Sequence, residues 1–189
     1  MKKTILAFLT LSLILVISSC AKKEEKDNGG TMTDHIDIES LEKDSLNISI
    51  EVPEKWVESS SSYFGTEIRH YMSLLEGNKD SFAESISVTA EKLPKDGTLE
   101  SYVEGNVNAL EITFTDFKTI SPVSTVKVGG YDGANFVFSY SAGTFDIVID
   151  QSFVVIDDTA YMIMCNATTD SYDGFKDIFA KARETFKIN

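Results

Sequence analysis

The chain is poor in the residue types on which most metal centres, disulfide frameworks and nucleophilic active sites depend. Its 189 residues include two cysteines, Cys20 and Cys165, and two histidines, His35 and His70. No two of these residues stand at the spacing of a zinc site. The sequence also contains no Gly-x-Ser-x-Gly elbow. These absences argue against a zinc centre and against a serine or cysteine hydrolase.

Basic residues are scarce as well. The chain has 17 lysines and arginines against 30 aspartates and glutamates, a formal net charge of −13. Removal of residues 1–19, for which the reasons follow, leaves 15 basic against 30 acidic residues and a net charge of −15. A surface of this charge repels the phosphates of nucleic acids and gives no electrostatic attraction to anionic lipids. We therefore expect no nucleic-acid partner.

The N-terminus carries the three regions of a secretory signal peptide in their usual order. Two lysines give a positive start, an apolar run follows over residues 5–17, and two serines stand directly before Cys20. This run is shorter than the roughly 20 residues that a membrane-spanning helix needs. We predict a removable signal peptide over residues 1–19. The alternatives are an ordinary signal peptide with an incidental cysteine, or an uncleaved anchor.

The four residues Ile17–Cys20 resemble the lipobox of bacterial lipoproteins, in which the cysteine thiol receives a diacylglycerol before cleavage. Two or more acyl chains, such as palmitate, hold a protein stably at a membrane. We therefore expect Cys20 to attach the mature chain to the membrane, which leaves Cys165 without a disulfide partner. Because Ala21 rather than an acid follows the cysteine, the outer membrane, at its periplasmic face or at the cell surface, is favoured over the inner membrane.

The composition divides the mature chain into two parts. Residues 20–35 are charged and nearly free of large apolar side chains, which is typical of a flexible tether. Residues 36–189 have a globular composition, and about 150 residues suffice for one sizeable core. We predict a single domain over this second part.

Apolar residues alternate with polar ones through most of the predicted domain, which indicates β-strands. Strands are predicted near residues 46–52, 68–75, 86–90, 126–128, 134–140, 145–155 and 160–167. Short turns between successive strands favour an antiparallel meander. Helices are predicted over 99–110, with Thr98 as the N-cap, and over 172–186, each with one apolar stripe. Helices packed on an antiparallel sheet make an α+β fold.

Several pieces of this pattern occur in an order that resembles a known family. They are the strand end Val52–Trp56, the helix opening Gly97–Tyr102, the turn Val128–Gly133, the strand containing Tyr161, and the ending Thr185–Ile188. Over about residues 38–188, the chain is similar to the PsbP/DcrB-like domains of photosystem accessory proteins and small bacterial lipoproteins. The resemblance implies an α/β/α sandwich and little chemistry, because the family includes accessory, binding and uncharacterised members. We expect an accessory or binding role, with no enzymatic activity and no cofactor.

Two residues are candidates for a ligand or partner contact. Trp56, the only tryptophan, follows a strand-ending proline, where it either lines a groove or packs between the first strand and a helix. Asn106 lies in the apolar arc of the first helix, where a buried amide is either a satisfied structural group or a ligand contact. The packing and structural interpretations are favoured for both. Cys165 reads as an ordinary buried cysteine of a strand.

Acidic residues are numerous, but they form no recognisable metal-binding loop. Asp170, Asp173 and Asp177 could gather oxygens for calcium, and Asp146 and Asp150 share one strand face. No stretch matches the calcium-loop pattern, and helix capping and solvated charge are the favoured explanation of these acids. We predict no metal site. The sequence thus favours a non-enzymatic accessory or binding module of the cell envelope, with an envelope protein as its partner and an undetermined oligomeric state. The alternatives are a small-ligand carrier and a hydrolase that uses carboxylates.

Overall fold

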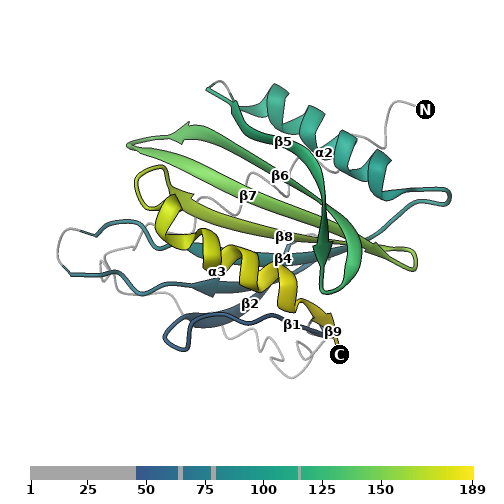
Figure 1. Ribbon diagram of the computed structural model, residues 1–189, viewed down its shortest axis with the longest axis horizontal. Coiled ribbons are helices and arrows are strands. Elements are labelled where there is room, and N and C mark those ends of the chain that lie inside the picture. Colours follow the sequence, from purple (N-terminus) through teal and green to yellow (C-terminus); the bar gives the residue numbers. More distant parts are fainter. Residues whose placement is uncertain (1–45, 64–65, 78–79, 115) are drawn as a thin grey trace, which may run out of the picture.

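A seven-stranded antiparallel sheet forms the centre of the molecule (Figure 1). The structure, a computed structural model, describes residues 46–63, 66–77, 80–114 and 116–189. The predicted signal peptide, Cys20, the predicted tether and the start of the predicted domain lie outside these residues. Along the sheet the strand order is β2-β3-β4-β8-β7-β6-β5. The strands are β2 Val57–Tyr63, β3 Thr66–Met72, β4 Ser85–Lys92, β5 Lys118–Val128, β6 Tyr131–Ala142, β7 Phe145–Ile156 and β8 Thr159–Thr168.

The sheet consists of two antiparallel meanders that meet at the β4–β8 pair. Strands β2, β3 and β4 form the first meander, and β5, β6, β7 and β8 form the second. Helix α2, Leu99–Thr113, follows β4 and carries the chain across the sheet to its far edge at β5. The predicted antiparallel meander is therefore correct for each half of the sheet.

Helices α2 and α3, Tyr172–Thr185, cover opposite faces of the sheet. The core on the α2 side contains many rings, among them Phe136, Phe138 and Phe153. The core on the α3 side contains the alternate, mainly aliphatic residues of the same strands together with Phe179 and Phe186. This arrangement confirms the predicted α+β class and the α/β/α sandwich. In the described part of the chain, neither helix combines the length and the apolar composition needed to cross a membrane.

The two ends of the described domain lie together in a small second sheet. Strand β1, Ile48–Ser49, pairs antiparallel with β9, Lys187–Ile188. The Asn47 side chain donates a hydrogen bond to the backbone carbonyl of Asn189 at 2.6 Å. Both ends therefore leave the fold at one place, at the opposite end of the molecule from α2 (Figure 1).

The predictions were wrong for the first strand of the domain and for both edge strands of the main sheet. The alternation over 46–52 yields only the two residues of β1, which pair with β9 instead of joining the main sheet. The serine-rich strand β2 was missed, and β5 was predicted only at its end. Lys118–Thr125 of β5 are exposed, and an edge strand that buries little shows no apolar alternation.

Candidate functional site

Helix α2 begins at a complete capping box. Thr98 accepts a hydrogen bond from the Ser101 N–H at 3.1 Å, and its own N–H donates to the Ser101 hydroxyl at 3.0 Å. The carboxylate of Glu100 in the first turn faces the positive end of the helix dipole. The helix ends where the Phe114 N–H donates to the Leu110 carbonyl. The predicted start at Thr98 is thereby confirmed.

Ring contacts fasten α2 over β6 and β7. The ring of Tyr102 meets that of Phe153 edge-on, with 6.0 Å between centroids. Phe114, just past the helix, stacks on Tyr140 with centroids 4.0 Å apart. The buried side chains of the helix are Tyr102, Val103, Asn106 and Leu110. Much of α2 therefore remains on the surface.

Asn106 lies on the buried side of α2, as the sequence predicts. Its side chain is 8% exposed, and its Nδ2 donates to the backbone carbonyl of Tyr102 at 2.8 Å. The Tyr102 hydroxyl in turn donates to Glu91 at 3.4 Å. Burial, and to a smaller extent the charge of Glu91, raises the pKa of Tyr102. Burial also raises the pKa of Glu91. The amide thus has a structural hydrogen bond, and a ligand contact stays a prediction.

A groove of about 620 Å³ separates α2 from the β5–β6 hairpin, and we call it the acidic groove. Its apolar floor is formed by one side of α2 and by the facing strands: Leu99, Val103, Val107, Val123 and Ala134. Carboxylates stand at its rim, with Glu100 and Glu104 on α2 and Asp132 on β6. The groove therefore combines an apolar floor with acidic edges.

A second hollow, of about 410 Å³, lies on the other flank of α2, against the Leu93–Gly97 segment; we call it the apolar hollow. Small residues of the helix, Ser101, Gly105 and Ala109, leave this space open, and Asn106 reaches it. Ile112 at its end is 82% exposed. Volumes of 300–1,000 Å³ with mostly apolar walls are typical of small-molecule pockets.

Trp56 lies on the opposite side of the sheet from Asn106. It stands directly before β2, where its ring is 6.2 Å from that of Phe175 on α3 and packs partly buried against the α3-side core. The structure therefore does not bring the two candidate residues into one site. Contact with a helix is what the packing interpretation of Trp56 expects.

A polar row crosses the first meander at His70. Its Nε2 lies 3.3 Å from the Ser61 hydroxyl on β2, and its Nδ1 lies 2.9 Å from the Ser87 hydroxyl on β4. Burial lowers the pKa of His70, which favours the neutral ring that both contacts suit. Because serines contact both ring nitrogens, no carboxylate among the described residues orients this histidine for general-base catalysis. Sequence reasoning missed the row, since it depends on strand register.

A second polar cluster holds α3 on the sheet. Asp150 of β7 accepts hydrogen bonds from Asn135 Nδ2 at 2.6 Å and from the Tyr172 hydroxyl at 3.2 Å. Arg183 of α3 approaches the same carboxylate to 3.9 Å. Burial and, secondarily, the charge of Asp150 raise the pKa of Cys165 well above its usual value, so this buried thiol is a poor nucleophile. The polar groups of this cluster therefore bond to one another within the fold.

The acidic residues considered as metal ligands do not gather. Asp146 accepts a hydrogen bond from the Ser141 hydroxyl at the β6–β7 hairpin, whereas Asp150 belongs to the α3 cluster. Asp173 forms an ion pair with Lys176 one turn further along α3. Among the residues that the structure describes, no group of three or more His, Cys, Asp or Glu side chains is placed to hold a metal ion.

Comparison with known proteins assigns the family. Residues 40–188 match the model of the family described as the serine/threonine kinase C-terminal domain. The chain belongs to the serine/threonine kinase C-terminal domain family. The sequence contains neither the glycine-rich loop nor the His-Arg-Asp loop of protein kinases. No curated protein sequence matches the chain significantly.

Solved structures place this member of the family in the PsbP-like fold. LpqN from Mycobacterium tuberculosis, described as involved in cell envelope biogenesis, has a TM-score of 0.58 at 18% identity over 75% of this chain and 83% of its own. Cyanobacterial PsbP from Synechocystis scores 0.56 at 15% identity, over 76% and 87%. The Ran-binding protein Mog1p from Saccharomyces cerevisiae scores 0.51 at 15% identity, over 75% and 90%. The resemblance to PsbP-like domains is thereby confirmed at the level of the fold.

Proposed function

We propose that the chain is a cell-envelope lipoprotein whose PsbP-like domain is a non-enzymatic accessory module. Acyl chains on Cys20 attach it to the membrane, and the surface around α2 binds an envelope partner. The outer membrane, at its periplasmic face or at the cell surface, is the proposed location. LpqN is described as involved in cell envelope biogenesis and Mog1p as a Ran-binding protein, and these descriptions support a binding or accessory role for the fold.

The observation that carries this proposal is the contrast between the surface of α2 and the polar clusters of the sheet. Both ring nitrogens of His70 are bonded to serines, and Asp150 is bonded to Asn135 and Tyr172. Neither cluster sets a reactive nucleophile beside a base, the geometry that covalent catalysis needs. The acidic groove and the apolar hollow instead offer open apolar area, which suits binding.

A small-ligand carrier is the second candidate, and the apolar hollow is the observation that favours it. The hollow has the volume and the wall chemistry of a small-molecule pocket, with the amide of Asn106 as a polar group at its side. A carrier purified gently from membranes retains its ligand, so native mass spectrometry would detect a defined extra mass. An accessory module shows the lipidated protein mass alone.

Membrane fractionation with a native size measurement tests the proposal. Wild-type protein should sediment with membranes and, after solubilisation in mild detergent, migrate in a complex larger than the single chain. Cys20→Ala should appear in the soluble fraction or as an unprocessed precursor, and it should lose the complex. A Cys20→Ala protein that is processed at the same site and stays on the membrane would overturn the lipoprotein claim. A wild-type protein that migrates alone would overturn the accessory role.

A further inference from the structure

We propose that the acidic groove binds a basic amphipathic helix of a partner protein. The inference rests on the proposed binding role of the domain and names its surface and the chemistry of its partner. Three features of the groove carry the inference: its length along α2, its charge, and the shape of the strand that forms its far wall.

The floor of the groove repeats with the period of a helix. Leu99, Val103 and Val107 stand four residues apart and form one apolar line along α2. Val123 of β5, which is 48% exposed, and Ala134 of β6 face this line across the groove. A partner helix that presents apolar residues at positions i, i+4 and i+8 would fill such a floor.

The edges of the groove supply the charge complementarity. Glu100 and Glu104 are exposed one turn apart on α2, beside the apolar line. From Asp96 to Phe117 the sequence contains five acidic residues and no lysine, arginine or histidine. On the opposite wall Asp132 is partly neutralised by Lys127 at 2.7 Å. The α2 edge therefore selects for lysines or arginines beside the apolar stripe of the partner.

The far wall favours a helix over an added strand. Strand β5 is the edge of the sheet, but its pairing with β6 shifts register twice, between Thr119 and Ser121 and between Ser121 and Ser124. Pro122 lies inside this irregular stretch and has no N–H to donate. Such bulges and prolines protect sheet edges from strand addition. The partner is therefore expected to lie on the face of the sheet, alongside α2.

Peptide binding to the lipidated mature protein in phosphatidylcholine nanodiscs tests the proposal, with empty nanodiscs as the blank. The probe is a labelled peptide of about 16 residues made of Leu-Lys-Lys-Leu repeats, which matches α2 in length when helical. One comparison peptide has glutamates in place of the lysines. Another has the same composition in strict Leu-Lys alternation, the period of a strand. Fluorescence anisotropy should show clear binding of the helical basic peptide only.

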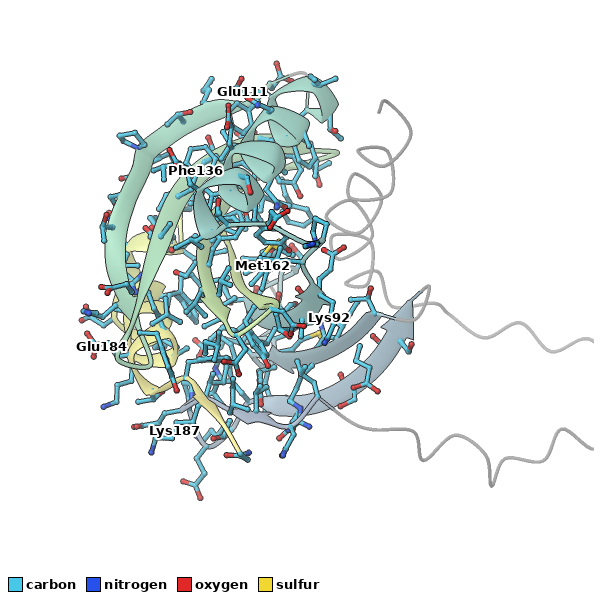
Figure 2. The ribbon with its side chains drawn as sticks, turned by 90° about the vertical axis from the view of Figure 1, so that its right-hand side faces the viewer. Lys92, Glu111, Phe136, Met162, Glu184 and Lys187 are labelled. Carbon is cyan, nitrogen blue, oxygen red and sulfur yellow. The ribbon has the colours of Figure 1, made fainter. Side chains whose placement is uncertain are left out.

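Two matched double variants locate the binding. Glu100→Lys with Glu104→Lys should weaken the probe about tenfold, as expected when close rim charges are reversed. The control, Asp177→Lys with Glu184→Lys, changes the net charge equally on exposed positions of α3, at the other end of the molecule; Figure 2 shows Glu184 there and Glu111 of α2 at the opposite end. The control should leave binding within about twofold. Val123→Arg, on the β5 wall, should weaken binding while leaving α2 unchanged.

Several outcomes would contradict the proposal that the acidic groove binds a basic amphipathic helix. Equal weakening by both double variants would show a response to overall acidity alone. Equal binding of the glutamate peptide would show a purely hydrophobic contact, and preference for the alternating peptide would show strand addition. If cells carrying Glu100→Lys and Glu104→Lys retain the membrane complex of the wild type, the partner does not bind in the acidic groove, while the proposed accessory role still holds. Loss of membrane attachment in Cys20→Ala concerns the proposed function alone.

Discussion

Trp56 packs against helix α3 from a position directly before the edge strand β2. The packing interpretation expects a ring between the first strand and a helix, and the ring does contact Phe175 of α3. It is only partly buried, however, since it stands before the edge strand β2 instead of beneath a central one. Its contribution to stability should therefore fall below that of a fully buried tryptophan.

Trp56→Ala should lower the free energy of unfolding by about 2 kcal/mol, less than the roughly 3–5 kcal/mol of a fully buried ring. Trp56→Phe should recover most of this loss, because the position contributes apolar contact with Phe175. Urea midpoints of the two variants measure the effect. A midpoint unchanged by Trp56→Ala, together with weakened formation of the native complex, would instead make Trp56 a partner contact.

His70 predicts a pH dependence of stability. Burial lowers the pKa of the folded-state ring below its ordinary value of 6.5, so the unfolded chain binds a proton more readily. The neutral ring of His70 is therefore fully compatible with the fold above about pH 6.5. The free energy of unfolding decreases as the pH falls from there towards the folded-state pKa of His70. Urea midpoints at pH 7.5 and 5.5 should differ more for wild type than for His70→Gln, in which groups such as Glu91 titrate unchanged. Equal pH dependence would contradict the burial of the ring.

The residues of the polar row show what sequence alone could not reach. Ser61, His70 and Ser87 come from three strands, and they align only because of the registers of two strand pairs. A shift of one residue would turn His70 to the other face of the sheet. Asn106, by contrast, was placed correctly because its position depends only on the helical period of its own segment.

Among the elements, predictability follows burial. Helices α2 and α3 and strands β6, β7 and β8 each bury one face or both, so their apolar spacing is visible in the sequence. Short turns at Gly143 and at Asp157–Asp158 separate the last three strands. The edge strands β2 and β5 bury little and were missed or shortened for that reason. The acidic groove was missed with them, because its far wall is β5.

The turn between β5 and β6 is hydrogen-bonded to the C-terminal end of α3. Gly129 has a φ of +57°, and its N–H donates to the Arg183 carbonyl at 2.9 Å. A Cβ at this position would collide with the backbone carbonyl of Phe186, whereas Gly143, with a φ of +62° in the β6–β7 hairpin, has open space around it.

Gly129→Ala should therefore destabilise the domain by more than Gly143→Ala. The latter should cost about 1–2 kcal/mol through its left-handed backbone alone, and the collision adds to this cost at Gly129. Chemical denaturation of both variants measures the difference. Equal losses would mean that the end of α3 moves aside freely.

The whole domain should behave as one cooperative unit. Both meanders share the β4–β8 pair, and two cores on opposite faces extend across the sheet. A chain that begins at Ile36 should unfold in a single transition that is the same by fluorescence and by circular dichroism. Limited proteolysis of the mature chain should cut first within residues 21–35. Early cuts between residues 45 and 185, or two separate transitions, would contradict the predicted boundary.

The small β1–β9 sheet determines how the domain would respond to mechanical force. A membrane anchor at the N-terminal side and a partner held at α2 would together pull on residue 46. This force would act at the N-terminal end of β1. The two paired residues of β1 would separate from β9 one after the other, since their antiparallel pairing is loaded from its end. Ile48, which is 1% exposed, would then have to leave the core on the α3 side before load reached the seven-stranded sheet. The groove along α2 would keep its shape while the first strand detached.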